Sequence, residues 1–323
     1  MKTDNLPPVP GDARHLSSRL ARPILAPEIS RKGGTAGLGE CAPQSAGKCT
    51  LVGAGPGDPE LLTIKAARAI QAATVLLVDD LVNDEIVTAY ASPGARIVYV
   101  GKRGGCKSTP QAFIEKLMVM AAHEGENVVR LKGGDPFIFG RGGEEVEHLQ
   151  AAGVQVEVVN GITSGLAAVT SLGVPLTHRE HAQGVVFVTG HAKPGDDGTD
   201  WRALAATAHS ARLTLVIYMG VSGAARIECE LLHGLPGTTP VAIIQNASLP
   251  TQRHAVTTLG QMQRTIQDKQ LASPCIIVVG EVLRGVALAE LAELSELSEL
   301  SPRANMTAVA HESLLQEAQR RAG

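Results

Sequence analysis

The sequence predicts an α/β fold with two α/β lobes and a ligand cleft between them. Short apolar runs of strand length alternate with segments of helical periodicity, which is typical of a sheet covered by helices. The pattern restarts after Gly161, so that two sets of five expected strands follow one another along the chain. Clefts between two such lobes are common sites for small molecules.

The first lobe is expected over residues 49–162. It opens with a strand at Leu51 and Val52, which runs into the glycine turn GAGPG and then into a helix with apolar spacing through Ile70. Further strands are expected at 75–78, 97–100, 128–131 and 154–159, with helices at 111–123 and 144–152. Because helices separate most of the strands, we expect a largely parallel sheet.

The second lobe is expected over residues 163–287 and begins with a helix in ITSGLAAVTS. Its strands are expected at 185–189, 213–219, 241–245, 255–259 and 275–279, with helices at 201–208 and 224–233. Residues 1–48 are proline-rich without a sustained period, which predicts a disordered N-terminal extension. Residues 288–323 carry leucine at every third position, which gives no single apolar face and predicts an accessory helix or a disordered tail.

The composition argues against several classes of function. A net charge of −3 and only one tryptophan, three tyrosines and four phenylalanines give no reason to expect nucleic acid. The five cysteines lack paired spacing and the histidines lack metal-ligand spacing, so we expect no metal site and a reducing cytoplasm. No apolar run reaches the roughly 18 residues of a membrane span, so no membrane partner is expected.

The stretch VVRLKGGDPFIFGRGGEEVEHL, residues 128–149, has the features of a ligand-binding turn. A buried strand is followed by Gly133 and Gly134, where the backbone can approach a ligand closely. Asp135, Arg141 and Glu144 stand among five glycines, and Glu144 falls in the first turn of the next helix. The alternative is a plain strand-to-helix connection, which ordinarily uses fewer glycines.

The first glycine turn resembles a dinucleotide-binding loop, but its spacing is wrong. Gly53, Gly55 and Gly57 are followed by Asp58 where the third glycine of a Rossmann loop would stand. Asp79 nevertheless ends the next strand, near the position of a ribose-binding acid. Binding of a nicotinamide or flavin cofactor is therefore the less favoured alternative.

Basic residues gather where strands end. Lys102 and Arg103 follow one expected strand, Lys132 ends another, and Arg141 lies in the glycine turn. Arg179 stands in PLTHREH between two histidines. If the strands are parallel, the first three of these positions share the carboxyl edge of the sheet, where α/β folds bind ligands. A polyanionic small molecule is the ligand class that this arrangement favours.

Several motifs together resemble one family. GAGPGDPELLTIKAARAI, VDDLV, VGKRGG, RLKGGDPFIFGRGGEE, NGITS, PLTHRE and YMGV occur in this order over residues 50–282 and are similar to the uroporphyrinogen-III C-methyltransferases. These are S-adenosylmethionine-dependent tetrapyrrole methyltransferases with two α/β lobes, typically homodimers. The resemblance implies transfer of methyl groups to C2 and C7 of uroporphyrinogen III, which gives precorrin-2 for sirohaem, cobalamin or haem d1 biosynthesis. This sequence departs from the family pattern at Cys106, Lys107 and Ala247.

The resemblance also implies roles for individual residues. The expected contacts of S-adenosylmethionine are Pro56, Gly133, Gly134, Asp135, Ile138, Thr163, Ser164, Met219 and Ala247. Similar enzymes have a proton acceptor at the position of Asp79 and a proton donor at that of Lys102. Arg141, Glu144 and Arg179 match residues placed around the tetrapyrrole.

The identity of the base that removes the proton after methyl transfer stays open at this stage. Asp79 is a reasonable base, whereas a guanidinium stays protonated, so we favour binding of a substrate carboxylate for Arg141. Methyltransferases that act on RNA ribose or on a protein side chain are alternatives within the same fold. A non-catalytic nucleotide-binding protein is an alternative from another class.

Overall fold

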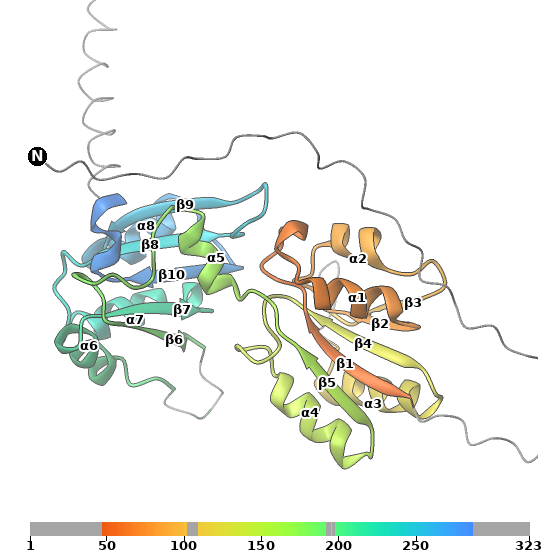
Figure 1. Cartoon of the computed structure of the whole chain (residues 1–323). Coiled ribbons are helices and arrows are strands. Elements are labelled where there is room, and N and C mark those ends of the chain that lie inside the picture. Colours follow the sequence, from red (N-terminus) through yellow and green to blue (C-terminus); the bar gives the residue numbers. More distant parts are fainter. Residues whose placement is uncertain (1–46, 102–108, 192–194, 196–197, 287–323) are drawn as a thin grey trace, which may run out of the picture. The chain divides into compact units, whose positions relative to one another are not determined.

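A computed structural model describes residues 47–101, 109–191, 195 and 198–286 of the protein (Figure 1). The predicted tail over residues 288–323 and nearly all of the predicted extension over residues 1–48 lie outside these ranges. At the end of that extension, Gly47 already donates a backbone hydrogen bond to Ala122 and Lys48 begins a strand. The described residues therefore include the last two of the predicted extension, Gly47 and Lys48, and Lys48 belongs to a strand.

The first sheet has five strands in the order β3-β2-β4-β1-β5. All of its strand pairs are parallel, which confirms the predicted direction. The strands are β1 (Lys48–Gly53), β2 (Val75–Val78), β3 (Arg96–Tyr99), β4 (Asn127–Lys132) and β5 (Gln155–Val159). The central strand β4 is buried over five of its six residues, because helices cover both faces of the sheet.

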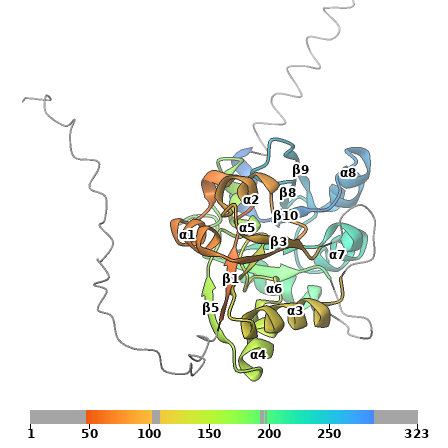
Figure 2. The same ribbon diagram turned by 90° about the vertical axis from the view of Figure 1, so that its right-hand side faces the viewer.

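Alternate residues of these strands enter two separate cores. Leu76 and Val78 face the core that holds helices α1 (Ile64–Ala72) and α2 (Asp84–Tyr90). Val75 and Leu77 face the core that holds α3 (Gln111–His123) and α4 (Gly142–Ala151). Figure 2 shows α1 and α2 on one side of this sheet and α3 and α4 on the other. The carboxyl ends of the parallel strands are thereby left open at one edge.

The second sheet also has five strands, in the order β6-β7-β10-β8-β9. Only β6 and β7 are parallel; β10 lies antiparallel between β7 and β8, and β9 is antiparallel to β8. The strands are β6 (Gly184–Thr189), β7 (Leu213–Tyr218), β8 (Pro240–Gln245), β9 (Arg253–Thr258) and β10 (Cys275–Val279). Its helices are α5 (Ser164–Thr170), α6 (Trp201–Ser210), α7 (Ala224–Leu231) and α8 (Met262–Asp268).

The core of the second lobe is divided in the same way as that of the first. Trp201, Ile227 and Met262 come from α6, α7 and α8 and share one core with alternate residues of the strands. Ala168 and Val169 of α5 lie in the core on the opposite face. Short helices thus cover both faces of a mixed sheet, which confirms the predicted α/β class.

Each expected strand is present, with ends shifted by at most a few residues. Helices α2 and α8 are not among the elements expected from the sequence; each has only seven residues and buries two apolar residues. Such short helices lack the repeated apolar spacing on which the prediction depends. The predicted lobe boundary falls between β5 and α5. Within the described ranges, no helix is both long and apolar enough to cross a bilayer.

Candidate active site

A cavity of about 980 Å³ lies at the carboxyl edge of the first sheet and is also lined by residues of the second lobe. Each residue expected to contact the cofactor lines it: Pro56, Gly133, Gly134, Asp135, Ile138, Thr163, Ser164, Met219 and Ala247. Asp79 and Arg141 line it too. Residues that are far apart in sequence are therefore brought together as expected, although their roles stay predictions.

Four glycines let the strand ends meet backbone to backbone. Gly55 and Gly134 form an antiparallel bridge, with Gly134 N donating to Gly55 O at 2.7 Å. A Cβ added at Gly53 would lie 2.6 Å from Gly134 O, and one added at Gly161 would overlap the same oxygen. Gly134 also has a φ of +67°, which side chains rarely adopt. The glycines of GAGPG, GGDP and NGITS thus form one packed floor beside the cavity.

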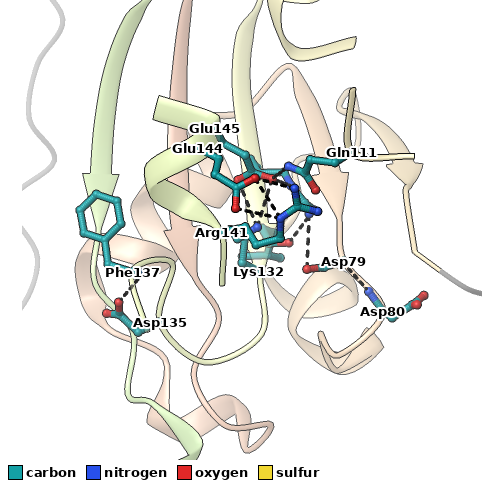
Figure 3. Close-up of polar contacts among 11 residues, drawn as sticks. Asp79, Asp80, Gln111, Lys132, Asp135, Phe137, Arg141, Glu144 and Glu145 are labelled. Atoms are coloured by element: carbon teal, nitrogen blue, oxygen red, sulfur yellow. Dashed lines mark hydrogen bonds and ion pairs between the residues drawn. The ribbon is translucent and has the colours of Figure 1, made fainter. Parts of the chain in front are cut away.

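The carboxylate of Asp135 holds two turns together. Its Oδ1 accepts a hydrogen bond from Phe137 N at 2.8 Å (Figure 3). Its Oδ2 accepts hydrogen bonds from Asn160 Nδ2 and from Gly161 N, both at 3.1 Å. Asp135 is buried. Because both of its oxygens are engaged by the protein, its side chain fixes the turns after β4 and β5, and the backbone of these turns is left to face a ligand.

Tyr218 anchors the beginning of α5 to the second sheet. Its hydroxyl lies 2.7 Å from Thr163 Oγ1 and accepts a hydrogen bond from Gly165 N at 2.8 Å. Phe139 packs against its ring, with centroids 4.8 Å apart. Burial raises the pKa of the Tyr218 hydroxyl, which therefore stays protonated at neutral pH. Tyr218 thereby orients two residues that line the cavity, Thr163 and Ser164.

Four cavity residues other than glycine adopt left-handed backbone conformations. Their φ values are 54° for Phe139, 58° for Arg141, 54° for Met219 and 53° for Asn246. Such conformations cost free energy for residues with a Cβ and concentrate at functional sites. Their grouping around one cavity is an independent indication that the cavity binds a ligand.

Behind the cavity wall lies a buried cluster of charges centred on Glu145. Its side chain is fully buried, and its Oε1 accepts hydrogen bonds from Gln111 Nε2 at 3.0 Å, Lys132 Nζ at 3.1 Å and Arg130 Nε at 3.2 Å (Figure 3). Lys132 Nζ also lies 3.1 Å from Oε2, which has no hydrogen bond of acceptable geometry. Two cations thus offset one carboxylate in a site shielded from water.

Arg130 connects this cluster to Asp79 in the cavity. Its Nη2 lies 3.4 Å from Asp79 Oδ2, and Asp79 Oδ1 accepts a hydrogen bond from Asp80 N at 3.2 Å. The Arg130 side chain is 2% exposed, whereas that of Asp79 is 35% exposed. Arg130 therefore contacts the Asp79 carboxylate from the buried side, and the carboxylate remains accessible from the cavity.

Lys132 differs from what the sequence suggests. It does end β4 and line the cavity, but its ammonium is buried against Glu145 and is not a free cation for a polyanion. Burial, followed by the neighbouring charge of Arg130, lowers the pKa of Lys132. The sequence alone does not reveal this burial, because Glu145, the partner of Lys132, lies in the helix that follows the glycine turn.

The remaining expected site residues lie in different settings. The guanidinium of Arg141 donates two hydrogen bonds to the carboxylate of Glu144 (Figure 3). Arg141 lines the cavity, whereas Glu144 does not. Arg179 is exposed and is likewise absent from the lining. Lys102, Arg103, Cys106 and Lys107 lie outside the described residues.

Four residues of this site are not among those predicted from the sequence: Arg130, Glu145, Gln111 and Tyr218. A signal was present for Arg130, because an arginine within the apolar run VVRLK must find a buried partner if the run is a central strand. Glu145 gave no such signal, since an acid in the first turn of a helix is ordinarily exposed. Its burial follows from the packing of α4 against the sheet.

A group of possible metal ligands occurs elsewhere. Ligand atoms of His178, Glu180 and His181 lie within 4.8 Å of one another on a turn that does not line the cavity. The rings of the two histidines stack with centroids 4.5 Å apart. His178 Nδ1 accepts a hydrogen bond from Glu180 N, which occupies one of the nitrogens that a metal would need.

Comparison with known proteins agrees with the architecture of this site. The family described as Tetrapyrrole (Corrin/Porphyrin) Methylases matches residues 48–263, which include the glycine turns and most of both lobes. The chain therefore belongs to the tetrapyrrole methylases, which confirms the resemblance found in its motifs.

The chain is 53% identical over 241 residues to uroporphyrinogen-III C-methyltransferase from Pseudomonas aeruginosa, a match that covers 74% of this chain and 96% of that protein. It is 48% identical to siroheme synthase from Azotobacter vinelandii, of which it spans only 52%.

Among solved structures, a similar one is the uroporphyrin-III C-methyl transferase from Thermus thermophilus complexed with S-adenyl homocysteine. The TM-score is 0.62 at 41% identity, and the match covers 74% of this chain and 94% of that chain.

Proposed function

We propose that the protein is an S-adenosylmethionine-dependent C-methyltransferase that adds methyl groups to C2 and C7 of uroporphyrinogen III and releases precorrin-2. The observation that carries the proposal is the cavity, whose lining unites the glycine turns after β1 and β4 with Thr163, Met219 and Ala247. Two relatives that are 53% and 50% identical to this chain are named uroporphyrinogen-III C-methyltransferase.

The cavity suits S-adenosylmethionine in the chemistry of its walls. Gly133 and Gly134 present backbone without side chains, and Ile138 and Ala247 supply apolar surface. Thr163 and Ser164 offer hydroxyls at the start of α5. We assign cofactor binding to these residues together with Pro56, Asp135 and Met219.

Bound S-adenosylmethionine supplies an electrophilic methyl group and leaves as a neutral thioether, so that the reaction requires no metal. The protein must align the pyrrole carbon with that methyl group and exclude water. The carbon must afterwards lose a proton, and we assign its removal to Asp79, a carboxylate that lines the cavity. The family resemblance gives the proton-donor role to Lys102.

Recognition of the substrate requires cations, because uroporphyrinogen III carries eight carboxylates. We assign one carboxylate to Arg141, which lines the cavity and has a planar guanidinium suited to paired contacts. Glu144 would then orient Arg141, and Arg179 would meet a more distant part of the macrocycle. We further infer a metal-free cytoplasmic homodimer, in keeping with unpaired cysteines and the resemblance to the family.

Calorimetric measurement of ligand binding distinguishes the proposed methyltransferase from a nicotinamide-dependent enzyme. S-adenosylhomocysteine should bind with a saturable signal at micromolar concentration, and NAD should give none, because the first glycine turn lacks Rossmann spacing. Saturable binding of NAD without any signal from S-adenosylhomocysteine would overturn the proposed function.

A further inference from the structure

We propose that Glu145, which does not touch the cavity, is a positioning residue that aims the carboxylate of Asp79 at the substrate through Arg130. The inference rests on the proposed function, in which Asp79 accepts the proton. It assigns a role in the reaction to a fully buried carboxylate and to the arginine that links it with the cavity.

Glu145 is the point where separate parts of the cavity wall meet. One of its oxygens accepts hydrogen bonds from Arg130 and Lys132 of β4 and from Gln111 at the start of α3. Each of these three donors lines the cavity, whereas Glu145 is 0% exposed. A carboxylate in this place fixes the donors relative to one another, because each must keep its contact with the same atom.

Arg130 carries this constraint to Asp79. Its Nε donates to Glu145 and its Nη2 lies 3.4 Å from Asp79 Oδ2, so that two neighbouring nitrogens of one rigid planar group contact the two carboxylates. Turning the guanidinium to improve one contact would disturb the other. The direction in which Asp79 points is therefore coupled to the position of Glu145.

The charges make this coupling strong. Glu145, Arg130 and Lys132 are buried together, and the net positive charge of the three is balanced by Asp79 at the cavity end. Loss of one partner in such a cluster leaves an uncompensated charge, so the others rearrange. Asp79 is the partially exposed member of the four, and its side chain can move most readily. A change at Glu145 should therefore appear at Asp79.

The test compares Glu145→Gln in two backgrounds, the wild type and Asp79→Asn. Glu147→Gln serves as the matched control, because Glu147 is an exposed glutamate on the same helix. For each protein we would measure kcat for methyl transfer to uroporphyrinogen III, the Kd of S-adenosylhomocysteine and the Tm. Turnover by the wild type is measured first, because its absence would overturn the proposed function and with it this inference.

We expect Glu145→Gln to lower kcat on the order of 10- to 100-fold, as a misdirected catalytic group does. The Kd of S-adenosylhomocysteine should change by no more than about twofold, since the glycine turns are held by Asp135 and by backbone hydrogen bonds and not by Glu145. In the Asp79→Asn background the same substitution should lower kcat by less than about twofold, because the group that it misdirects is already lost. The control should stay within about twofold of the wild type.

A merely structural role gives a different pattern. If Glu145→Gln lowers kcat by the same factor in both backgrounds, Glu145 does not act through Asp79 and the inference is overturned, while the proposed function stands. Glu145→Asp keeps the charge but is one methylene shorter, so it should recover Tm more fully than kcat. Complete recovery of kcat by this variant would also overturn the inference.

Removing a buried charge can prevent folding. If Glu145→Gln is not obtained as a folded protein, the same comparison is made with Arg130→Lys, which keeps a cation but cannot reach both carboxylates as a planar fork does. Loss of kcat in the wild-type background alone supports the inference, and equal loss in both backgrounds overturns it.

Discussion

The guanidinium of Arg141 and the carboxylate of Glu144 form an ion pair at the start of α4, with Nη2 2.5 Å from Oε2. Each of the two side chains is 53% exposed, and the pair raises the pKa of Arg141. Exposed ion pairs contribute only about 0–1 kcal/mol to stability. Glu144 can therefore keep Arg141 oriented beside the cavity, and a substrate carboxylate can replace Glu144 at a small cost in free energy.

Arg141→Ala should lower kcat/KM by on the order of 10- to 100-fold, because a charged hydrogen bond contributes about 1.5–3 kcal/mol. The affinity for S-adenosylhomocysteine should be nearly unchanged, since the Gly133–Asp135 turn is held by Asp135 and not by Arg141. Kinetics, calorimetry and thermal melting of the same variant provide the measurement.

Arg141→Lys is the matched variant and should recover only part of the activity, because an ammonium lacks the planar pair of donors. If Arg141→Ala instead weakens cofactor binding and lowers Tm together, the pair with Glu144 serves only to stabilise the turn. Unchanged turnover would remove Arg141 from the site.

Gly161→Ala should reduce stability by about 1–3 kcal/mol, the usual cost of overpacking. Its new methyl group would overlap Gly134 O and approach Gly53, and these backbone atoms cannot move aside independently. Binding of S-adenosylhomocysteine should weaken with it, because the same turn lines the cavity.

Gly143→Ala is the control for that substitution, since a Cβ at this helical position meets nothing within 4 Å. It should be neutral or stabilise the protein by about 0.4–1 kcal/mol. Equal denaturant midpoints for the two variants would refute the packed arrangement of Gly53, Gly134 and Gly161.

Tyr218→Phe should cost about 1–3 kcal/mol, because it removes the acceptor of the buried Gly165 N–H. The start of α5 should loosen, so we expect weaker binding of S-adenosylhomocysteine in addition to a lower Tm. Hydrogen exchange of the α5 amides would report the loosening directly. A variant with wild-type affinity and wild-type exchange would show that the Thr163–Tyr218 contact does not organise the site.

The cysteines should differ in reactivity. Burial raises the pKa of the Cys49 thiol from 9.0 to about 12, and that of the cavity residue Cys275 from 9.0 to about 12. At pH 8 iodoacetamide should therefore label the exposed Cys229 and spare the other two in the native protein, as peptide mass analysis would reveal. Labelling of Cys275 as fast as Cys229 would contradict its burial.

The same shifts have a consequence for stability. Between pH 9.0 and about 12 the unfolded chain releases these two thiol protons, whereas the folded protein keeps them. The free energy of unfolding is therefore at its full value below pH 9.0 and decreases as the pH rises toward 12. Denaturant melts across this window should show the decline, and Cys49→Ser with Cys275→Ser should diminish it.

Much of the fold followed from local patterns in the sequence. Buried strands such as 75–78 and 275–279 are uninterrupted apolar runs, and α3 has a long amphipathic pattern between a proline and a glycine. The antiparallel insertion of β10 between β7 and β8 could not be foreseen, because strand order depends on contacts between distant segments.

The site was predicted less evenly than the fold. Glycine turns and residues of distinctive motifs, such as Gly134 and Thr163, could be identified because their sequence context is unusual. The contacts of Arg130 with Glu145 and Asp79 could not be predicted, because these three side chains come from a strand, a helix and a loop that only tertiary packing brings together. Lys132 was misjudged for the same reason, since its burial depends on α4.

Transfer of methyl groups from S-adenosylmethionine to uroporphyrinogen III can be measured by mass analysis of the tetrapyrrole. The purified protein is incubated anaerobically with both compounds, and the methyl groups added to the tetrapyrrole are counted. We expect a product that carries two additional methyl groups, with S-adenosylhomocysteine formed in matching amount. A tetrapyrrole of unchanged mass, from a folded protein that binds S-adenosylhomocysteine, would contradict this expectation.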